Sequence, residues 1–328
     1  MIISKYNHYK IQREIKNMEF IKDQCNTKPE KVQEIIKGIR KIVAEMYEKV
    51  TPKEITQRTN VKKMKLSDVD IITISIAGEM TGADSERGWY AYCRKNYAEI
   101  FGEFCERSRY NRIRRNLHIV IRQIFDEIVK ILGMGDVGVI DSAPLPVCKF
   151  GRARFHRTYK GYGASYGRCV SKKETYFGYK LHVICSLEGY PARYVLTPAN
   201  TDDREAVAEL AEDLPLWALL ADKGYIGVKF ARRLFDETGL HIFTPSRSNA
   251  KKPSMSRHLG RAVFKRRRRI ETFFSQLSDQ FNFQRVRAKS LWGLIARLNC
   301  KFLAFIVSVF LNKIFDFSDL CKIKHFLY

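Results

Sequence analysis

Three acidic side chains hold positions from which they could act together. In chain order, each follows or lies within an expected regular element: Asp141 after the apolar run 137–140, Asp222 after the apolar run 216–221, and Glu271 within an expected helix over 262–281. The ends of neighbouring strands can meet at one edge of a sheet, and a helix packed on that sheet can add a third side chain. Carboxylates gathered in this way repel one another unless cations neutralise them.

The chemistry open to such a cluster is that of hard divalent cations. Oxygen ligands with open coordination positions suit Mg²⁺ or Mn²⁺. Two such ions about 3.5–4 Å apart can activate a water or a hydroxyl and stabilise the leaving oxygen of an in-line phosphodiester displacement. The sequence therefore predicts a two-ion site held by Asp141, Asp222 and Glu271.

Each acid also has an ordinary structural explanation. An Asp at the end of a strand commonly forms a turn or caps a helix. Glu271 could simply pair with Arg267 or Arg268 on its own helix. Taken singly, these explanations are the commoner ones, but the three acids together, in this order and beside much positive charge, favour a joint site.

The chain carries far more positive charge than solubility requires. Its 328 residues include 59 Lys and Arg against 35 Asp and Glu, a net charge of +24, whereas a small soluble domain needs a magnitude of only about 2–8. Ten cations and no acid precede Glu271 in the segment 247–270. This clustered excess predicts a polyanionic partner or an anionic surface.

A second basic segment, 149–182, combines nine cations and one acid with eight aromatic residues. Cations can hold phosphates while aromatic rings stack on unpaired bases. The alternative is a surface loop under which the aromatic residues pack. The sequence leaves both explanations open, and both can hold in part.

The first 133 residues have helical patterns. Apolar residues recur at helical spacing within 32–46, 69–80 and 113–132. The last helix is expected to begin near Ser108 and carries arginines in its first turns, where cations oppose the helix dipole. Arg109, Arg112 and Arg115 are therefore either phosphate contacts of a helix-turn-helix-like unit or part of a solvated face.

After Gly133 the pattern changes to short apolar runs that alternate with helices. The expected order is three strands, a helix, a strand, a helix, a strand and a helix, over 137–140, 179–187, 190–197, 202–214, 216–221, 228–238, 241–244 and 262–281. This order predicts an α/β domain with a mixed sheet. We expect a helical DNA-binding region over 1–133, a catalytic core over 134–316 and a tail over 317–328.

Other classes of protein lack support. The sequence has no secretory pattern, no zinc-knuckle spacing among its eight cysteines, no phosphate-binding glycine loop and no nucleophile elbow. The most apolar segment, 291–315, contains Arg297, Lys301 and Lys313, so we expect a buried core helix rather than a membrane span. These features predict a cytoplasmic protein with reduced thiols and no membrane partner.

Three short blocks resemble the signature blocks of bacterial insertion-sequence DDE transposases, in particular the insertion-sequence family designated nine-eighty-two. They are Ile140-Asp141-Ser142, Ala221-Asp222-Lys223-Gly224-Tyr225 and Arg268-Arg269-Ile270-Glu271-Thr272. Two further blocks are similar to that family's core, namely Tyr179-Lys180-x-His182 and Thr197-Pro198-Ala199-Asn200, and 66–117 resembles its helical N-terminal part. Each block alone is a weak signal, whereas their combination and order are fairly specific.

The resemblance implies an RNase H-like catalytic core in which Asp141, Asp222 and Glu271 form the metal-binding triad for Mg²⁺ or Mn²⁺, with two ions. It implies a DNA transposase that cuts the ends of an insertion sequence and joins the freed 3′-hydroxyl to target DNA. Its partners would be double-stranded DNA with terminal inverted repeats, target DNA, and further copies of the chain in a homodimer or larger synaptic complex. Its expected location is the bacterial cytoplasm, with the nucleoid.

The expected DNA-binding side chains near the triad are cationic: Arg267, one turn before Glu271, with Lys223, Lys265, Arg266, Arg268 and Arg269. Related transposases carry a Tyr-x-x-Arg-x-x-x-Glu-x-x-x-x-x-x-Lys signature. Arg267 and Glu271 match it, whereas Phe264 replaces the Tyr and Ser278 replaces the Lys. These departures leave open which side chains hold the phosphates of the transposon end.

Two other functions remain open from the sequence. A nuclease of the same fold, including a degenerate transposase copy, would hydrolyse DNA without strand transfer. A non-enzymatic DNA-binding regulator would use the acids only structurally. The basic segments suit all three functions, so the acids decide among them.

Overall fold

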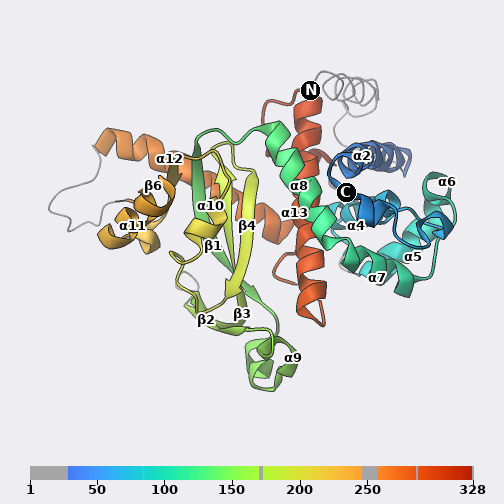
Figure 1. Cartoon of the computed structure of the whole chain (residues 1–328), viewed down its shortest axis with the longest axis horizontal. Coiled ribbons are helices and arrows are strands. Elements are labelled where there is room, and N and C mark those ends of the chain that lie inside the picture. The colour runs from blue at the N-terminus through green and yellow to red at the C-terminus, as the bar shows by residue number, and fades with distance from the viewer. Residues whose placement is uncertain (1–28, 84, 170–172, 246–256, 286, 327–328) are drawn as a thin grey trace. The chain divides into compact units, whose positions relative to one another are not determined.

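The computed structural model describes residues 29–83, 85–169, 173–245, 257–285 and 287–326, and it divides into two compact units (Figure 1). The first unit is the described part of Met1–Ile131 together with Trp292–Tyr328, and the second is that of Leu132–Leu291. The boundary lies beside the change of pattern at Gly133. Helix α13 (Leu291–Ile314), which the sequence assigns to the catalytic core, groups with the first unit instead.

The first unit is helical throughout its described part. Its elements are α2 (Pro29–Val50), α3 (Lys53–Thr56), η2 (Val61–Lys63), α4 (Asp68–Met80), α5 (Glu86–Asn96), α6 (Ala98–Phe101), α7 (Arg107–Asn116), α8 (His118–Leu132), α13 and η5 (Ile323–Phe326). Helix α4 begins at a capping box, in which Ser67 Oγ accepts from the Asp70 amide and the Asp70 carboxylate accepts from the Ser67 amide. Nearly all of α4 is buried, so it forms the centre of this unit.

The single helix expected from Ser108 to Leu132 is two helices, α7 and α8, which meet at Leu117. Periodicity does not reveal this break, because the local hydrogen bonds continue through it. The Leu117 amide donates to the Ile113 carbonyl, and the Leu117 carbonyl accepts from the Ile121 amide, each at 2.9 Å. Leu117 itself has left the helical conformation, with φ −81° and ψ 4°.

Helix α13 is long and apolar enough to cross a membrane by length and composition, but it is almost wholly buried inside the described structure. Two cations within it are buried and share one acidic partner. Arg297 Nε lies 3.3 Å from Glu79 of α4, and Lys301 pairs with the second oxygen of the same carboxylate. The expectation of a buried core helix agrees with this arrangement.

The second unit contains a six-stranded mixed sheet. Its strands are β1 (Val137–Pro146), β2 (Ser165–Cys169), β3 (Glu174–Ser186), β4 (Pro191–Pro198), β5 (Ala218–Leu220) and β6 (His241–Phe243). The order is β2–β3–β1–β5–β6, and β4 also pairs with β3. Strand β3 is antiparallel to β1, β2 and β4, whereas β5 is parallel to β1 and β6. The predicted mixed α/β fold is therefore correct for this unit.

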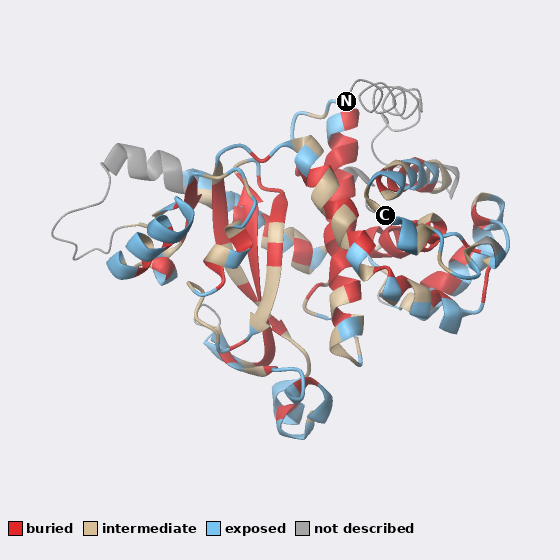
Figure 2. Ribbon diagram, in the orientation of Figure 1, coloured by how far each residue is buried: buried red, intermediate tan, exposed pale blue. Residues whose placement is uncertain are grey.

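The helices of the second unit follow the strands closely. They are η3 (Phe150–Phe155), α9 (Arg157–Lys160), α10 (Val207–Ala211), η4 (Lys223–Tyr225), α11 (Val228–Thr238) and α12 (Arg257–Asp279). Helix α11 ends at Gly239, whose φ of +71° explains why a glycine closes it. The strands in the middle of the unit are largely buried, and the helices expose their outer faces (Figure 2).

Strand β1 is longer than the sequence predicts and does not end at Ile140. It continues to Pro146 by pairing with β3, in a register that joins Ser142 to His182 and Pro146 to Gly178. Beyond the end of β5 only β3 pairs with this part of β1, so a proline without an N–H is tolerated on the open side. Strand β2 is not predicted from the sequence, and the helix expected over 202–214 is the shorter α10, Val207–Ala211.

Candidate functional site

Asp141 and Asp222 lie at the same level of two adjacent parallel strands. The last parallel pair of β1 and β5 joins Val139 to Leu220, and each Asp lies two residues beyond its partner in that pair. Asp222 therefore follows the end of β5, as expected, whereas Asp141 lies within β1 where β5 stops. The Asp222 carboxylate is oriented by the Gly224 amide, which donates to Oδ1 at 2.7 Å.

Glu271 is linked to Asp141 through the side chain of Arg267. Both residues lie on α12, one turn apart, so their side chains share a helix face. Nη1 of Arg267 lies 3.2 Å from Oδ2 of Asp141, and Nη2 donates to Oε1 of Glu271 at 2.9 Å. The guanidinium thus bridges two of the three predicted acids and takes the position between them.

The environment of Asp141 is strongly negative. The pKa of Asp141 is raised to about 6, mainly by burial and also by the nearby charges of Asp222 and Asp203. The Ser142 amide, which donates to Oδ1 at 2.8 Å, and the Arg267 guanidinium lower this pKa. Three aspartates therefore share one partly buried region, in which Arg267 pairs with Asp141 and Lys180 pairs with Asp203.

Tyr225 lies close enough to these aspartates to feel their charges. Its side chain is buried, and its hydroxyl has no hydrogen-bond partner among the described residues. Burial, followed by the charges of Asp203, Asp141 and Asp222, raises the pKa of this phenol. Tyr225 therefore packs in the core and keeps one polar atom without a partner among the described residues.

The donor chemistry of this region suits a hard cation, but its geometry is not that of a finished metal site. Carboxylate oxygens are the ligands that Mg²⁺ and Mn²⁺ prefer. Within the described part of the chain, however, no group of three or more His, Cys, Asp or Glu side chains is arranged to hold a metal ion. Instead, Arg267 pairs with both Asp141 and Glu271.

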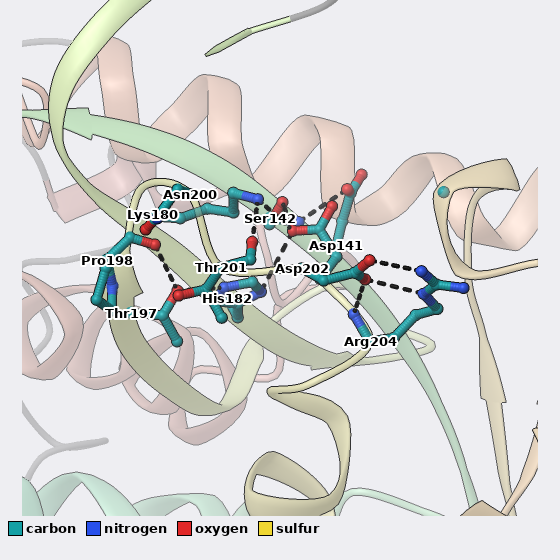
Figure 3. A network of polar contacts seen from close by, with 12 residues as sticks. Asp141, Ser142, Lys180, His182, Thr197, Pro198, Asn200, Thr201, Asp202 and Arg204 are labelled. Atoms are coloured by element: carbon teal, nitrogen blue, oxygen red, sulfur yellow. Dashed lines mark hydrogen bonds and ion pairs between the residues drawn. The ribbon is translucent and has the colours of Figure 1, made fainter. Parts of the chain in front are cut away.

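A fourth acid, Asp203, lies beside the predicted triad and was missed by the sequence analysis. It follows β4, and its Oδ1 accepts from Lys180 Nζ at 2.9 Å and from Ser142 Oγ at 3.1 Å. Lys180 also donates to the Thr201 carbonyl at 2.8 Å (Figure 3). These contacts join β1, β3 and the segment after β4 directly next to Asp141.

His182 completes the buried side of this network. It is fully buried on β3, and its Nε2 and the Thr197 hydroxyl are 2.8 Å apart (Figure 3). Burial lowers the pKa of His182 to about 4, although Asp203, 3.8 Å from its Nδ1, opposes this shift. The imidazole is therefore neutral at physiological pH and is held by packing and a hydrogen bond.

The sequence contained a signal for this network. Lys180 and His182 alternate along a strand, so both side chains point to one face, and the adjacent acids Asp202 and Asp203 follow the next strand. The pair was instead assigned to the start of a helix. Asp202 does make a local contact of the kind expected near a helix start, because it pairs with Arg204 at 2.5 Å.

The other predicted basic residues near the acids are exposed. Lys265, Arg266, Arg268 and Arg269 are exposed, as is Lys223 in η4. Ser278, which stands where related transposases have a lysine, donates its hydroxyl to the Phe274 carbonyl at 2.8 Å within its own helix. The basic positions of 246–256 and the side chain of Phe264 lie outside the described residues.

The arginines predicted to contact DNA in the helical unit have different environments. Arg109 and Arg112 are exposed on α7 and line a cavity with Lys65 and Arg94. The guanidinium of Arg115 lies 5.5 Å from the ring centre of Trp292, whose Nε1 donates to the Arg115 carbonyl at 3.0 Å. Only the first two therefore fit the expected phosphate contacts without rearrangement.

Comparison with known families gives a match that covers the segment containing the three acids. Residues 133–291 match the family model of the transposase DDE domain. The matched segment coincides with the second unit to within one residue and contains Asp141, Asp222 and Glu271. The match supports a DDE transposase, an enzyme that acts on DNA, and we call residues 133–291 the DDE domain. Comparisons with curated proteins and with solved structures find no match for the chain.

Proposed function

We propose that the chain is the DNA transposase of an insertion sequence of the family designated nine-eighty-two. It hydrolyses phosphodiester bonds at the ends of the element and transfers the freed 3′-hydroxyl to target DNA. The observation that carries this proposal is the common level of Asp141 and Asp222 on β1 and β5, with Glu271 joined to Asp141 through Arg267.

An RNase H-like core for the DDE domain is part of the proposal. The mixed sheet supports it, because the central strand β1 has an antiparallel partner, β3, on one side and a parallel partner, β5, on the other. Two acids come from the parallel strands, and the third comes from α12, which packs against β1 and β5. The fold thus brings acids from distant parts of the sequence to one sheet edge.

In this proposal Asp141, Asp222 and Glu271 hold Mg²⁺ or Mn²⁺, with two ions in the complete site. The bound ions would activate the attacking water or 3′-hydroxyl and stabilise the leaving oxygen. The unpartnered hydroxyl of Tyr225 and the crowding of aspartates around Asp141 support a cation here. Arg267 neutralises the acids when no ion is bound, and once displaced it is free to contact a DNA phosphate.

The proposed partner is double-stranded DNA. Exposed Lys265, Arg266, Arg268 and Arg269 lie on the helix that carries Glu271, and exposed Lys223 follows Asp222 directly, so phosphates bound there would lie beside the acids. The helical unit would contribute Arg109 and Arg112. Cutting two ends together requires a homodimer or a larger synaptic complex. The proposed location is the bacterial cytoplasm, with the nucleoid.

The test is a cleavage and strand-transfer assay on DNA that carries the element's flanking ends. Wild type is compared with Asp222→Asn and with the matched control Asp236→Asn, an exposed acid of α11 that pairs weakly with Arg232. We expect Mg²⁺-dependent cutting by wild type and the control, and at least about 100-fold less by Asp222→Asn with DNA binding retained. Pre-cut ends should join target DNA in the same reaction.

Each other outcome overturns the proposal in a definite way. Equal cutting by Asp222→Asn removes that residue from the site. Metal-dependent cutting without joining of pre-cut ends makes the protein a nuclease of the same fold. Binding without metal-dependent cutting leaves a DNA-binding regulator or an inactive copy.

A further inference from the structure

Residues 149–168 form a small lobe of the DDE domain that contains none of the three acids. The lobe follows β1 and consists of η3, α9 and most of β2. Helix α9 lies beyond the ends of β2 and β3, and its surface is largely exposed (Figures 1 and 2). We call residues 149–168 the aromatic lobe.

Two buried tyrosines attach the lobe to the rest of the domain. Tyr159 donates to the Ala288 carbonyl at 2.9 Å, and its ring centre lies 6.2 Å from that of Tyr179 on β3. Tyr179 in turn donates to the Tyr162 carbonyl at 2.9 Å. Packing under the loop therefore explains these two aromatic residues.

The other aromatic residues of the lobe keep about half or more of their surface exposed, although the ring of Tyr166 also contacts that of buried Phe177, with ring centres 5.1 Å apart. Phe150, Phe155, Tyr162 and Tyr166 are 55%, 69%, 54% and 46% exposed. They make up four of the ten exposed large hydrophobic side chains in the described chain, within a segment of twenty residues. Such a concentration of exposed rings marks an interaction surface.

The positive charges of the lobe are equally uncompensated. Its six cations are all exposed, and the lobe contains no acid: Lys149, Arg152, Arg154, Arg157, Lys160 and Arg168. In the described residues none of these six forms a salt bridge, although Lys160 donates to the Arg154 carbonyl at 2.9 Å. Like charges at this density repel one another unless a polyanion neutralises them.

The rings and the charges are interleaved rather than separate. The guanidinium of Arg154 lies 4.5 Å from the ring centre of Phe155, and the rings of Phe150 and Tyr166 meet edge to face at 6.0 Å. Alternating cations and exposed rings suit a nucleic acid strand, because cations hold its phosphates while rings stack on its bases. In a duplex the base faces are covered by neighbouring bases, so only unpaired bases can stack in this way.

We propose that the aromatic lobe is a binding site for unpaired DNA bases near the cut end of the element. The inference rests on the proposed function in taking DNA as the polyanion. The position of the lobe agrees with it, since the lobe begins three residues after β1 ends, and β1 extends five residues beyond Asp141. Five residues of strand span about 17 Å, the length of about five nucleotides in a duplex.

The test measures binding in a chelator, so that cleavage does not contribute. A fluorescein-labelled 12-nucleotide DNA single strand and the corresponding duplex are titrated with the full chain by anisotropy. The variant Phe155→Ala/Tyr162→Ala removes two exposed rings and keeps all six cations. The matched control is Phe235→Ala, a 46% exposed ring on α11 of the same domain.

We expect the double variant to bind the single strand at least about fivefold more weakly, since each lost base stack has about that effect or more. Its duplex affinity and its salt dependence should stay within about twofold of wild type, because the phosphate contacts remain. Phe235→Ala should match wild type on both DNAs. Equal melting temperatures of the three proteins establish that the exposed rings are not needed for folding.

Three results overturn the inference. An unchanged single-strand affinity removes the rings from binding, an equal loss on both DNAs makes the effect unspecific for unpaired bases, and tighter binding of an RNA strand of the same sequence reassigns the lobe to RNA. The metal-dependent cleavage assay is independent of this measurement. If wild type does not cleave DNA but its single-strand binding depends on the two rings, the proposed function alone is wrong. If wild type cleaves DNA but its single-strand binding does not depend on the rings, the inference about the lobe alone is wrong.

Discussion

Nη1 of Arg267 lies 3.2 Å from Oδ2 of Asp141, so the chain itself supplies a cation to the carboxylate at the centre of the candidate site. The same guanidinium binds Glu271. A divalent ion held by these two acids must displace Arg267 from both. The arginine and the ion therefore compete for one pair of carboxylates.

This competition predicts the effect of Arg267→Ala on metal binding. Removing a partly buried ion pair of about 1 kcal/mol should tighten Mn²⁺ binding about fivefold. Electron paramagnetic resonance of free Mn²⁺ measures the affinity without any DNA or turnover. Arg268→Ala, an exposed neighbour on the same helix, is the control and should leave the affinity within about twofold. Weaker or equal Mn²⁺ binding by Arg267→Ala would show that the guanidinium does not compete with the ion.

The raised pKa of Asp141 predicts a pH dependence of stability in the absence of metal. The pKa is about 6 in the folded chain, above its usual value of 3.8, so between these values the folded state holds a proton that the unfolded state has lost. The free energy of unfolding should therefore fall as the pH rises from about 4 to about 6, and level off above. Because the side chain is 24% exposed, we expect about 1–2 kcal/mol rather than the full linkage value.

Asp141→Asn isolates this contribution, because an amide does not titrate in this range. Urea unfolding of both proteins in a chelator, at intervals from pH 4.5 to 7, gives the difference in stability. The variant should gain on the wild type as the pH rises and the wild-type carboxylate becomes charged. A difference that stays constant over this range contradicts the raised pKa.

The sequence predicts the position of Asp222 because the end of β5 is visible as an apolar run that stops at a polar residue, whereas Asp141 lies within β1, which continues to Pro146. It does not predict the bridge by Arg267, since helical spacing alone allows that arginine to pair with Glu271, to face solvent or to contact a phosphate. Asp203 was missed for a related reason. Two consecutive acids after a strand resemble a helix start, and only pairing across β1 and β3 shows that Asp203 contacts Lys180.

The aromatic segment shows a second limit. Tyr159 and Tyr162 are three residues apart, with similar neighbours in the sequence, yet one is buried and the other exposed. The difference depends on Tyr179 and Ala288, which are distant in the sequence. The sequence therefore could not decide which aromatic residues of this segment pack under the loop and which remain exposed, because burial in an irregular segment depends on such remote contacts.

Asp203→Asn tests the network beside the triad. The substitution leaves Lys180 without its charged partner in a half-buried position, so we expect a loss of about 1–2 kcal/mol in the free energy of unfolding. A double-mutant cycle with Lys180→Met should give a coupling of about 1 kcal/mol. Asp202→Asn is the control, because its pair with Arg204 is exposed and should contribute about 0.5 kcal/mol or less. Equal losses for Asp202→Asn and Asp203→Asn would mean that the network adds no stability.

Glu79→Gln tests why α13 is a core helix. Glu79 is the partner of both Arg297 and Lys301, and Lys301 is almost completely buried. Removing the carboxylate charge leaves a buried ammonium without its counter-ion, which typically costs about 3–5 kcal/mol. The melting temperature by circular dichroism should therefore fall far more than for Glu34→Gln, whose pair with Lys37 is exposed. Burial already lowers the pKa of Lys301, so raising the pH should reduce the deficit by letting this ammonium lose its proton. Adding Lys301→Met should restore much of the loss at neutral pH, and a failure to do so would assign the instability to packing around Glu79 rather than to the unpaired charge.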